Sequence, residues 1–160
     1  MLERLLIAGS GGQGIVLAGR LLATVAVRQF RYVTFFPAYG AEVRGGTSNC
    51  HVVLSSEEIA SPLSDVVDSM IVMNQSSFDT FAPDLAHDCL LLVNSSMCKI
   101  PRRLLKAAVS IPATDIANQI GDTRTANFIM LGAYLARKPL VSPDHIEKGI
   151  EDVFAGKRRG

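Results

Sequence analysis

This chain of 160 residues lacks an excess of either charge, closely spaced cysteine pairs and long apolar runs. The 16 basic residues balance 15 acidic ones, so the formal net charge is +1 and no overall field would attract nucleic acid or an anionic membrane. No stretch approaches the ~18 apolar residues of a membrane span, and the apolar run after Arg4 breaks at glycine without a small-residue cleavage site. We therefore expect a cytoplasmic protein, with no nucleic-acid or membrane partner, whose ligands bind at local sites.

The residues that usually bind metals or perform catalysis are few and isolated. Cys50, Cys89 and Cys98 are widely spaced, form no C-x-x-C pair and have no histidine placed to complete a zinc site. The three histidines are separated in sequence and are interpreted as structural or surface residues. No Ser-His-Asp, Cys-His or paired-carboxylate arrangement is evident. We therefore predict neither catalytic residues nor metal ligands on this chain.

The distribution of apolar residues, 48% of the sequence, predicts one α/β domain over residues 1–160, with a frayed basic tail at 156–160. The continuous apolar run 5–8 is typical of a strand covered on both faces, and a helix is expected over 13–29, where close packing could offset the helix-weakening Gly19. We expect three layers, α/β/α, around a Rossmann-like mixed sheet, mostly parallel, with a β-hairpin. A second strand is expected at 32–36, ended by Pro37, and a hairpin at 50–54 and 58–60; three further strands are expected at 69–73, 89–93 and 107–111. Further helices are expected near 77–86, at 125–136 and at 143–154. A short helix is expected at 114–118, capped by Thr114 and ended by Gly121.

A glycine-rich turn connects the first predicted strand to the first predicted helix. Gly9, Gly11 and Gly14 satisfy the pattern G-x-G-x-x-G, which allows a tight turn and a close approach of the backbone to a ligand. The free amides at the helix start, with the positive end of the helix dipole, favour an anion. We therefore predict that this turn, with Gly12 and Gln13, binds a phosphate-bearing ligand; the alternative is a structural turn without a ligand.

The ribose half of a dinucleotide-binding pattern is missing. A dinucleotide site would place Asp or Glu about 20 residues after the turn, at the end of the second strand, to hold the ribose hydroxyls. The second predicted strand ends instead in Phe35-Phe36-Pro37-Ala38, and the nearest acid, Glu42, lies well inside the next loop. NAD binding is therefore disfavoured.

The loop after the second strand combines glycine with one carboxylate and one guanidinium. Residues 39–48 include Glu42, Arg44, Gly45 and Gly46, and the expected topology places them at the same carboxyl edge of the sheet as the first turn. The glycines allow the backbone to bend so that Arg44 presents its guanidinium as a fork to phosphate or carboxylate. An ordinary surface loop is the alternative.

A third polar group, residues 122–127, precedes a strongly apolar predicted helix. Thr123, Thr125 or Asn127 could cap that helix, and Arg124 could reach an anion. Capping alone explains most of the pattern, so Arg124 and Asn127 are second-rank candidates for ligand binding.

These motifs together resemble the gamma subunits of 2-oxoacid:ferredoxin oxidoreductases, the family acting on pyruvate, 2-oxoglutarate and ketoisovalerate. The resemblance covers nearly the whole chain and depends on GSGGQGI at 9–15, YGAEVRGGTS at 39–48, MNQ at 73–75 and NFIMLGA at 127–133. Many members carry proline where this chain has Ala41, which leaves Glu42 and Arg44 in place.

The resemblance implies a subunit that is inactive by itself. It would join thiamine-diphosphate-binding alpha and beta subunits and a ferredoxin-like delta subunit, which carry the thiamine diphosphate and the iron–sulfur clusters. The complex would decarboxylate a 2-oxoacid, form an acyl-coenzyme A and reduce ferredoxin. This domain would close over the active site and help to hold coenzyme A, whose phosphates we expect to meet Gly11, Gly12, Gln13 and Arg44.

Other readings of the same motifs stay open. A nucleotide-binding regulatory module would bind NAD, FAD or ATP at the first turn. A purely structural interface subunit would tolerate changes in the glycine loops. The sister subunit of indolepyruvate oxidoreductases shares the glycine motifs and acts on aryl 2-oxoacids.

Overall fold

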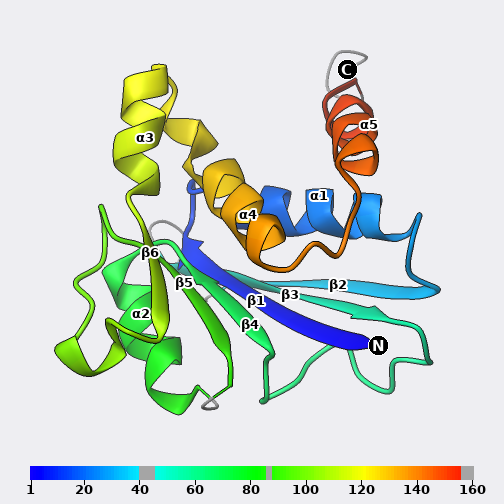
Figure 1. The fold of residues 1–160 in the computed structure, drawn as a ribbon, viewed down its shortest axis with the longest axis horizontal. Coiled ribbons are helices and arrows are strands. Elements are labelled where there is room, and N and C mark those ends of the chain that lie inside the picture. The colour runs from blue at the N-terminus through cyan, green and yellow to red at the C-terminus, as the bar shows by residue number, and fades with distance from the viewer. Residues whose placement is uncertain (40–45, 86–87, 156–160) are drawn as a thin grey trace.

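The computed structural model describes residues 1–39, 46–85 and 88–155. One six-stranded sheet, in the order β2-β3-β1-β4-β5-β6, separates two layers of helices (Figure 1). The expected α/β fold with a mixed sheet is confirmed. The strands are β1 Leu2–Ser10, β2 Tyr32–Tyr39, β3 Thr47–Ser55, β4 Ser69–Val72, β5 Leu90–Asn94 and β6 Ala108–Ile111.

Strand pairing explains which loops meet. β1, β4, β5 and β6 are parallel neighbours, whereas β3 is antiparallel to both β1 and β2. The register pairs Ser10 at the end of β1 with Thr47 at the start of β3. The turn after β1 and the residues before β3 therefore lie at the same edge of the sheet.

The helices cover the two faces unequally. α1, α3, α4 and α5 lie on one face and α2 on the other (Figure 1). Successive β1 side chains alternate between the faces, so Leu5 and Ile7 join the core beneath α1 and Leu6 joins the core beneath α2. This is why the run 5–8 is apolar throughout. The helices are α1 Ile15–Ala26, α2 Gln75–Phe81, α3 Ala113–Ile120, α4 Ala126–Arg137 and α5 Pro143–Ala155, with 3₁₀ turns at Ala82–Asp84, Arg102–Leu104 and Thr123–Thr125.

Within the described ranges, no helix is both long and apolar enough to cross a bilayer. The frayed tail expected at 156–160 lies outside the described residues.

Two strand predictions are wrong. β2 continues through Pro37 to Tyr39, because β2 is an edge strand and an edge tolerates the missing proline N–H. Residues 58–60 form no strand, and β3 makes its hairpin with the preceding β2. In the segment after β3, Ser61 and Ser64 bond to the backbone two residues on, and these local bonds compete with strand pairing.

The ends of α3 show one prediction confirmed and one corrected. Gly121 ends the helix in the left-handed region, with φ 92°, as its sequence position suggests. Thr114 lies inside α3 rather than capping it, and its hydroxyl accepts a hydrogen bond from Asn94 Nδ2 at 2.9 Å.

A buried carboxylate fixes α4 against the start of β1. Glu3 is only 5% exposed, and its Oε1 accepts hydrogen bonds from Ser69 Oγ at 2.6 Å and Tyr134 Oη at 2.9 Å. Lys138 Nζ lies 2.7 Å from Oε2 and supplies the opposite charge. Burial, with the adjacent Glu3 carboxylate, raises the pKa of Tyr134 well above its usual range. These partners satisfy a charge that would otherwise be costly to bury.

The middle of α1 packs closely on the sheet at Gly19. A Cβ at this position would collide with Cys50 Sγ and come within 3.0 Å of the Phe35 ring. The absence of a side chain therefore lets the helix approach β2 and β3, which offsets the poor helix propensity of glycine.

Two glycines within helices should respond oppositely to alanine. We expect Gly19→Ala to lower the free energy of unfolding by about 1–2 kcal/mol, because overpacking outweighs the gain in helix propensity. Gly132→Ala in α4 should raise it by about 0.5–1 kcal/mol, since a Cβ there meets no atom of the surrounding described residues within 4 Å. Urea unfolding measures both values. Adding Cys50→Ala to Gly19→Ala should recover part of the loss, and no recovery would contradict the overpacking explanation.

Candidate functional site

The glycine-rich turn lies between the end of β1 at Ser10 and the start of α1 at Ile15. Gly12 and Gly14 have φ of 91° and 73°, a region that side chains strongly disfavour. Gly14 is also the N-cap of α1, and a Cβ on it would collide with Asn127. Glycine is therefore required at position 14 both for conformation and for space.

Internal hydrogen bonds use some amides of the turn and leave others without a partner among the described residues. Ser10 N donates to Gln13 Oε1 at 2.7 Å, and Gln13 N donates to Ser10 O at 3.2 Å. Among the described residues, no acceptor pairs with the amides of Gly12 and Gly14. The first turn of α1 has no acidic residue, and no side chain caps it. The positive end of this helix is therefore available to an anion.

The end of the second glycine-rich loop, at Gly46, contacts the first glycine-rich turn. Gly11 N donates to Gly46 O at 3.2 Å, so the structure brings these two candidate residues together. The Gly11 amide is consequently engaged within the protein. Glu42, Arg44 and Gly45 lie outside the described residues, and their roles stay predictions.

The third candidate group divides between the turn and the surface. Asn127, only 3% exposed, donates from Nδ2 to Gly14 O at 2.8 Å, which ties the start of α4 to the turn. Arg124 instead pairs with Asp122 at 2.8 Å, and its side chain is 86% exposed. Hydrogen bonding to Arg124 lowers the pKa of Asp122 to about 2. Asp122 also accepts from Arg124 N and so caps the 3₁₀ turn. Of the residues expected to cap the following helix, Thr125 occupies the N-cap position of α4, but its side chain makes no capping hydrogen bond.

Two polar residues of the site were not assigned a role from the sequence. Asn74, the N-cap of α2 two residues after β4, donates to Ser10 Oγ and to Gln13 Oε1, the latter at 3.3 Å. Ser77, fully buried in α2, donates to Gly9 O at 3.1 Å. The available signal was an asparagine after a buried strand with serine three residues on, a pattern typical of a helix N-cap.

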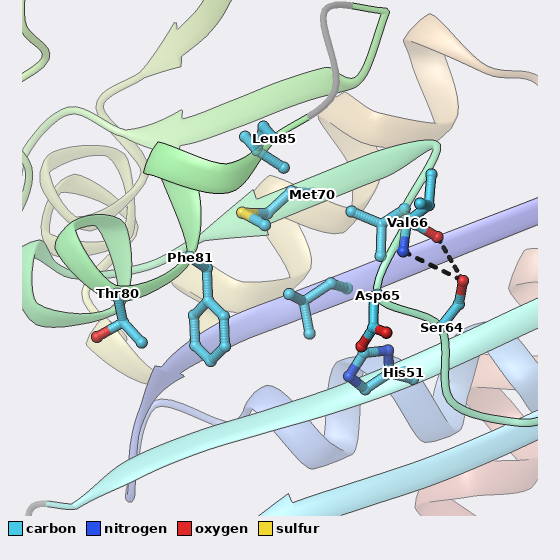
Figure 2. Close-up of a pocket in the computed structure, with 10 residues that line it drawn as sticks. His51, Ser64, Asp65, Val66, Met70, Thr80, Phe81 and Leu85 are labelled. Carbon is cyan, nitrogen blue, oxygen red and sulfur yellow. Dashed lines mark hydrogen bonds between the residues drawn. The ribbon is translucent and has the colours of Figure 1, made fainter.

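A separate cavity of about 420 Å³ opens on the α2 face of the sheet. Figure 2 shows apolar side chains such as Met70 and Phe81 on one side, with His51 next to Asp65 on the other. Burial lowers the pKa of His51, an effect that the Asp65 carboxylate partly offsets. The histidine thus belongs to strand β3 and faces a mainly apolar cavity, away from the glycine turn.

The three cysteines are separate free thiols, of which Cys50 and Cys98 are buried and Cys89 is half-buried. Cys50 packs beneath α1, whereas Cys98 belongs to the core on the other face of the sheet. Burial raises the pKa of Cys50 to about 12 and that of Cys98 to about 11. In the part of the chain that the structure describes, no group of three or more His, Cys, Asp or Glu residues could hold a metal ion.

Fold and site together define an α/β domain with a glycine-rich turn at the carboxyl edge of a mixed sheet. The chain belongs to the pyruvate ferredoxin/flavodoxin oxidoreductase family, whose model matches residues 4–159. This membership confirms the resemblance inferred from the glycine motifs.

Known proteins similar to this chain include both long and short ones. Ketoisovalerate oxidoreductase subunit VorA of Methanothermobacter thermautotrophicus is 38% identical over 98% of this chain and 33% of its own length. The chain thus spans about a third of the first curated relatives it matches. The gamma subunit of a keto/oxoacid ferredoxin oxidoreductase from Geobacter sulfurreducens has a TM-score of 0.76 and 25% identity, covering 95% of this chain and 85% of that one.

A further solved structure shares the fold. The 2-oxoglutarate:ferredoxin oxidoreductase of Magnetococcus marinus, with 2-oxoglutarate, coenzyme A and succinyl-CoA bound, has a TM-score of 0.86 over 98% of this chain and 27% of that one. Its sequence identity is 21%, so this likeness shows the fold alone.

Asn127 and Arg124 should differ sharply in their effect on stability. We expect Asn127→Ala to lower the free energy of unfolding by about 1–2 kcal/mol, because it removes a buried hydrogen bond and leaves a void. Arg124→Ala should leave stability essentially unchanged, since its side chain lies in solvent. Urea unfolding of the two variants gives the comparison, and equal losses would contradict the role assigned to Asn127.

The imidazole of His51 should titrate below its usual pKa of 6.5. Because the folded pKa is depressed, the associated stability is present above about pH 6.5 and is lost as the pH falls through the folded value. NMR titration of the imidazole measures the midpoint. Asp65→Asn should lower it further, and a midpoint above 6.5 in the unaltered chain would refute the effect of burial.

Proposed function

We propose that this chain is the gamma-type part of a 2-oxoacid:ferredoxin oxidoreductase, a single domain over residues 1–160 that holds coenzyme A and closes over the active site. The complete enzyme would decarboxylate a 2-oxoacid oxidatively, form the acyl-CoA and reduce ferredoxin. Family membership and the similarity to a gamma subunit that covers 85% of that chain support this proposal.

The glycine turn is the observation that favours coenzyme A. Coenzyme A carries several phosphates, and the Gly12 and Gly14 amides with the uncapped start of α1 offer donors and a positive dipole. A Cβ on Gly11 or Gly12 would meet no atom of the described residues within 4 Å, which favours a close approach of a ligand to the backbone. The proposed set of binding residues is Gly9, Gly11, Gly12, Gln13, Gly14, Glu42, Arg44, Gly45 and Gly46, with Arg124 and Asn127 second.

In this proposal, members of the set have different tasks. The backbone of Gly12 and Gly14 faces the phosphate, and the Arg44 guanidinium supplies the positive charge. Gln13 and Asn127 use their side chains to hold the turn, which keeps the donors in place. An ordered turn has less conformational freedom to lose when the ligand binds, which favours affinity.

Partner subunits supply what this chain does not. We propose that thiamine diphosphate and the iron–sulfur clusters reside on alpha, beta and ferredoxin-like delta partners, so the isolated chain would be inactive. The separated, buried thiols of Cys50 and Cys98 fit no cluster on this chain. The cytoplasmic location expected from the sequence also remains a prediction.

The strand order disfavours the alternative of an NAD-binding module. In dinucleotide-binding sheets the second strand lies beside the first, and its terminal acid reaches the ribose. Here β3 lies between β1 and β2, which moves the end of β2 away from the turn by about one strand spacing, ~4.8 Å. The described end of β2 also carries no acid.

Substitutions at the turn and at Arg44 should weaken coenzyme A binding without lowering the stability of the fold. We expect Gly11→Ala to raise the KM for coenzyme A about tenfold, because the methyl group would fill space on the ligand side and meets no atom of the described part of the chain. Arg44→Ala should raise it ~10–100-fold through loss of a charge-assisted hydrogen bond. Steady-state kinetics of the complex reconstituted with its partner subunits measures both.

Gly132→Ala is the matched control, since it also adds a methyl group in open space but lies in the middle of α4. Its KM for coenzyme A should stay within twofold of the unaltered complex. An unchanged KM in both Gly11→Ala and Arg44→Ala would refute the coenzyme A role, and calorimetric binding of NAD would favour the regulatory module.

A further inference from the structure

We propose that Asn74 is a positioning residue for the phosphate-binding turn. From its place after the neighbouring strand β4, the Asn74 carboxamide fixes the shape of that turn. This inference rests on the proposed function, because the turn is taken to receive coenzyme A. Asn74 is not assigned to bind the ligand itself.

The two ends of the Asn74 carboxamide serve different elements. Its Oδ1 accepts a hydrogen bond from Ser77 N at 2.9 Å and so caps α2. Its Nδ2 donates to Ser10 Oγ and to Gln13 Oε1, the latter at 3.3 Å. These partners determine the orientation of the amide, because a flipped side chain would set its NH₂ against the Ser77 N–H, which can only donate.

Neighbours of Asn74 hold the turn from both sides. Before the turn, Ser77 Oγ donates to Gly9 O at 3.1 Å and Met73 N donates to Ala8 O at 2.9 Å. Within the turn, Gln13 Nε2 donates to Met73 O at 3.5 Å. The segment between β4 and α2 therefore contacts the chain both where it enters the turn and near the end of the turn.

The composition of the turn explains why such support matters. Glycines lose more conformational freedom on folding than other residues, and Gly12 and Gly14 are held at positive φ in this turn. Gln13 Oε1 accepts a hydrogen bond from Ser10 N within the turn, and Asn74 Nδ2 donates to the same oxygen. Loss of the Asn74 donor should therefore loosen the turn and weaken ligand binding while the surrounding sheet stays intact.

Asn74→Ser separates the two tasks of the side chain. Serine is a good N-cap and should preserve α2, but it has no amide donor and is too short to reach Gln13. In the complex with partner subunits, we expect hydrogen exchange at Ser10, Gly11 and Gln13 amides to become about tenfold faster, as loss of one hydrogen bond predicts. The KM for coenzyme A should rise ~3–10-fold, while kcat at saturating coenzyme A and the KM for the 2-oxoacid stay within twofold.

Two further variants identify the route of the effect. Thr80→Ala removes a hydroxyl-to-carbonyl hydrogen bond within α2, from Thr80 Oγ1 to Ser76 O at 2.8 Å, and should change neither exchange nor KM. If Asn74 acts through Gln13, combining Asn74→Ser with Gln13→Ala should raise the KM less than the product of the two single effects. A fully multiplicative result would overturn this route.

The outcomes separate this inference from the proposed function. Unchanged exchange of the turn amides in Asn74→Ser would overturn the positioning role. A normal KM for coenzyme A in Asn74→Ser, together with a raised KM in Gly11→Ala, would also overturn the positioning role. The proposed function would then stand. A normal KM for coenzyme A in Asn74→Ser, Gly11→Ala and Arg44→Ala alike would overturn the proposed function and this inference with it.

Discussion

The attachment of α4 to β1 at both ends of the strand is the constraint on which the site depends. At the start of β1, the buried Glu3 carboxylate bonds to Tyr134 and Lys138 near the end of the helix. Beyond the other end, Asn127 at the start of the helix bonds to Gly14. A helix fixed at two points cannot slide along the strand, so the turn has a rigid support on the α4 side. α2 supports the same turn from the opposite face of the sheet.

The sequence was informative where one residue type has one physical explanation. A continuous apolar run implies a doubly covered strand, and glycines at G-x-G-x-x-G spacing imply a strand-to-helix turn, so β1, the turn and α1 were predictable. Pro37 was misjudged because the effect of proline depends on whether its strand is an edge, which the local sequence does not reveal. The Asn74 contacts were equally hidden, since they join residues about sixty positions apart that only the β1–β4 pairing brings together.

The described contacts also change the chemical character of the site. Side chains that looked available for a ligand, those of Gln13 and Asn127, hydrogen-bond within the protein. The exposed part of the turn, at Gly11 and Gly12, is backbone, and backbone amides recognise negative charge and shape rather than a particular base or sugar. Under the proposed function, selectivity for one phosphorylated ligand over another would then come from groups around the turn, including the Arg44 loop and surfaces of partner subunits.

Pro37 also affects how copies of the chain can meet. An exposed edge strand invites another strand to extend its sheet, and such extension leads to disordered association as well as to specific assembly. In β2 the proline removes one donor from the row of backbone groups that an incoming strand would need. The hairpin edge is thereby protected against sheet-to-sheet polymerisation. Subunits that join this domain are expected to dock by side-chain complementarity on its faces rather than by continuing its sheet.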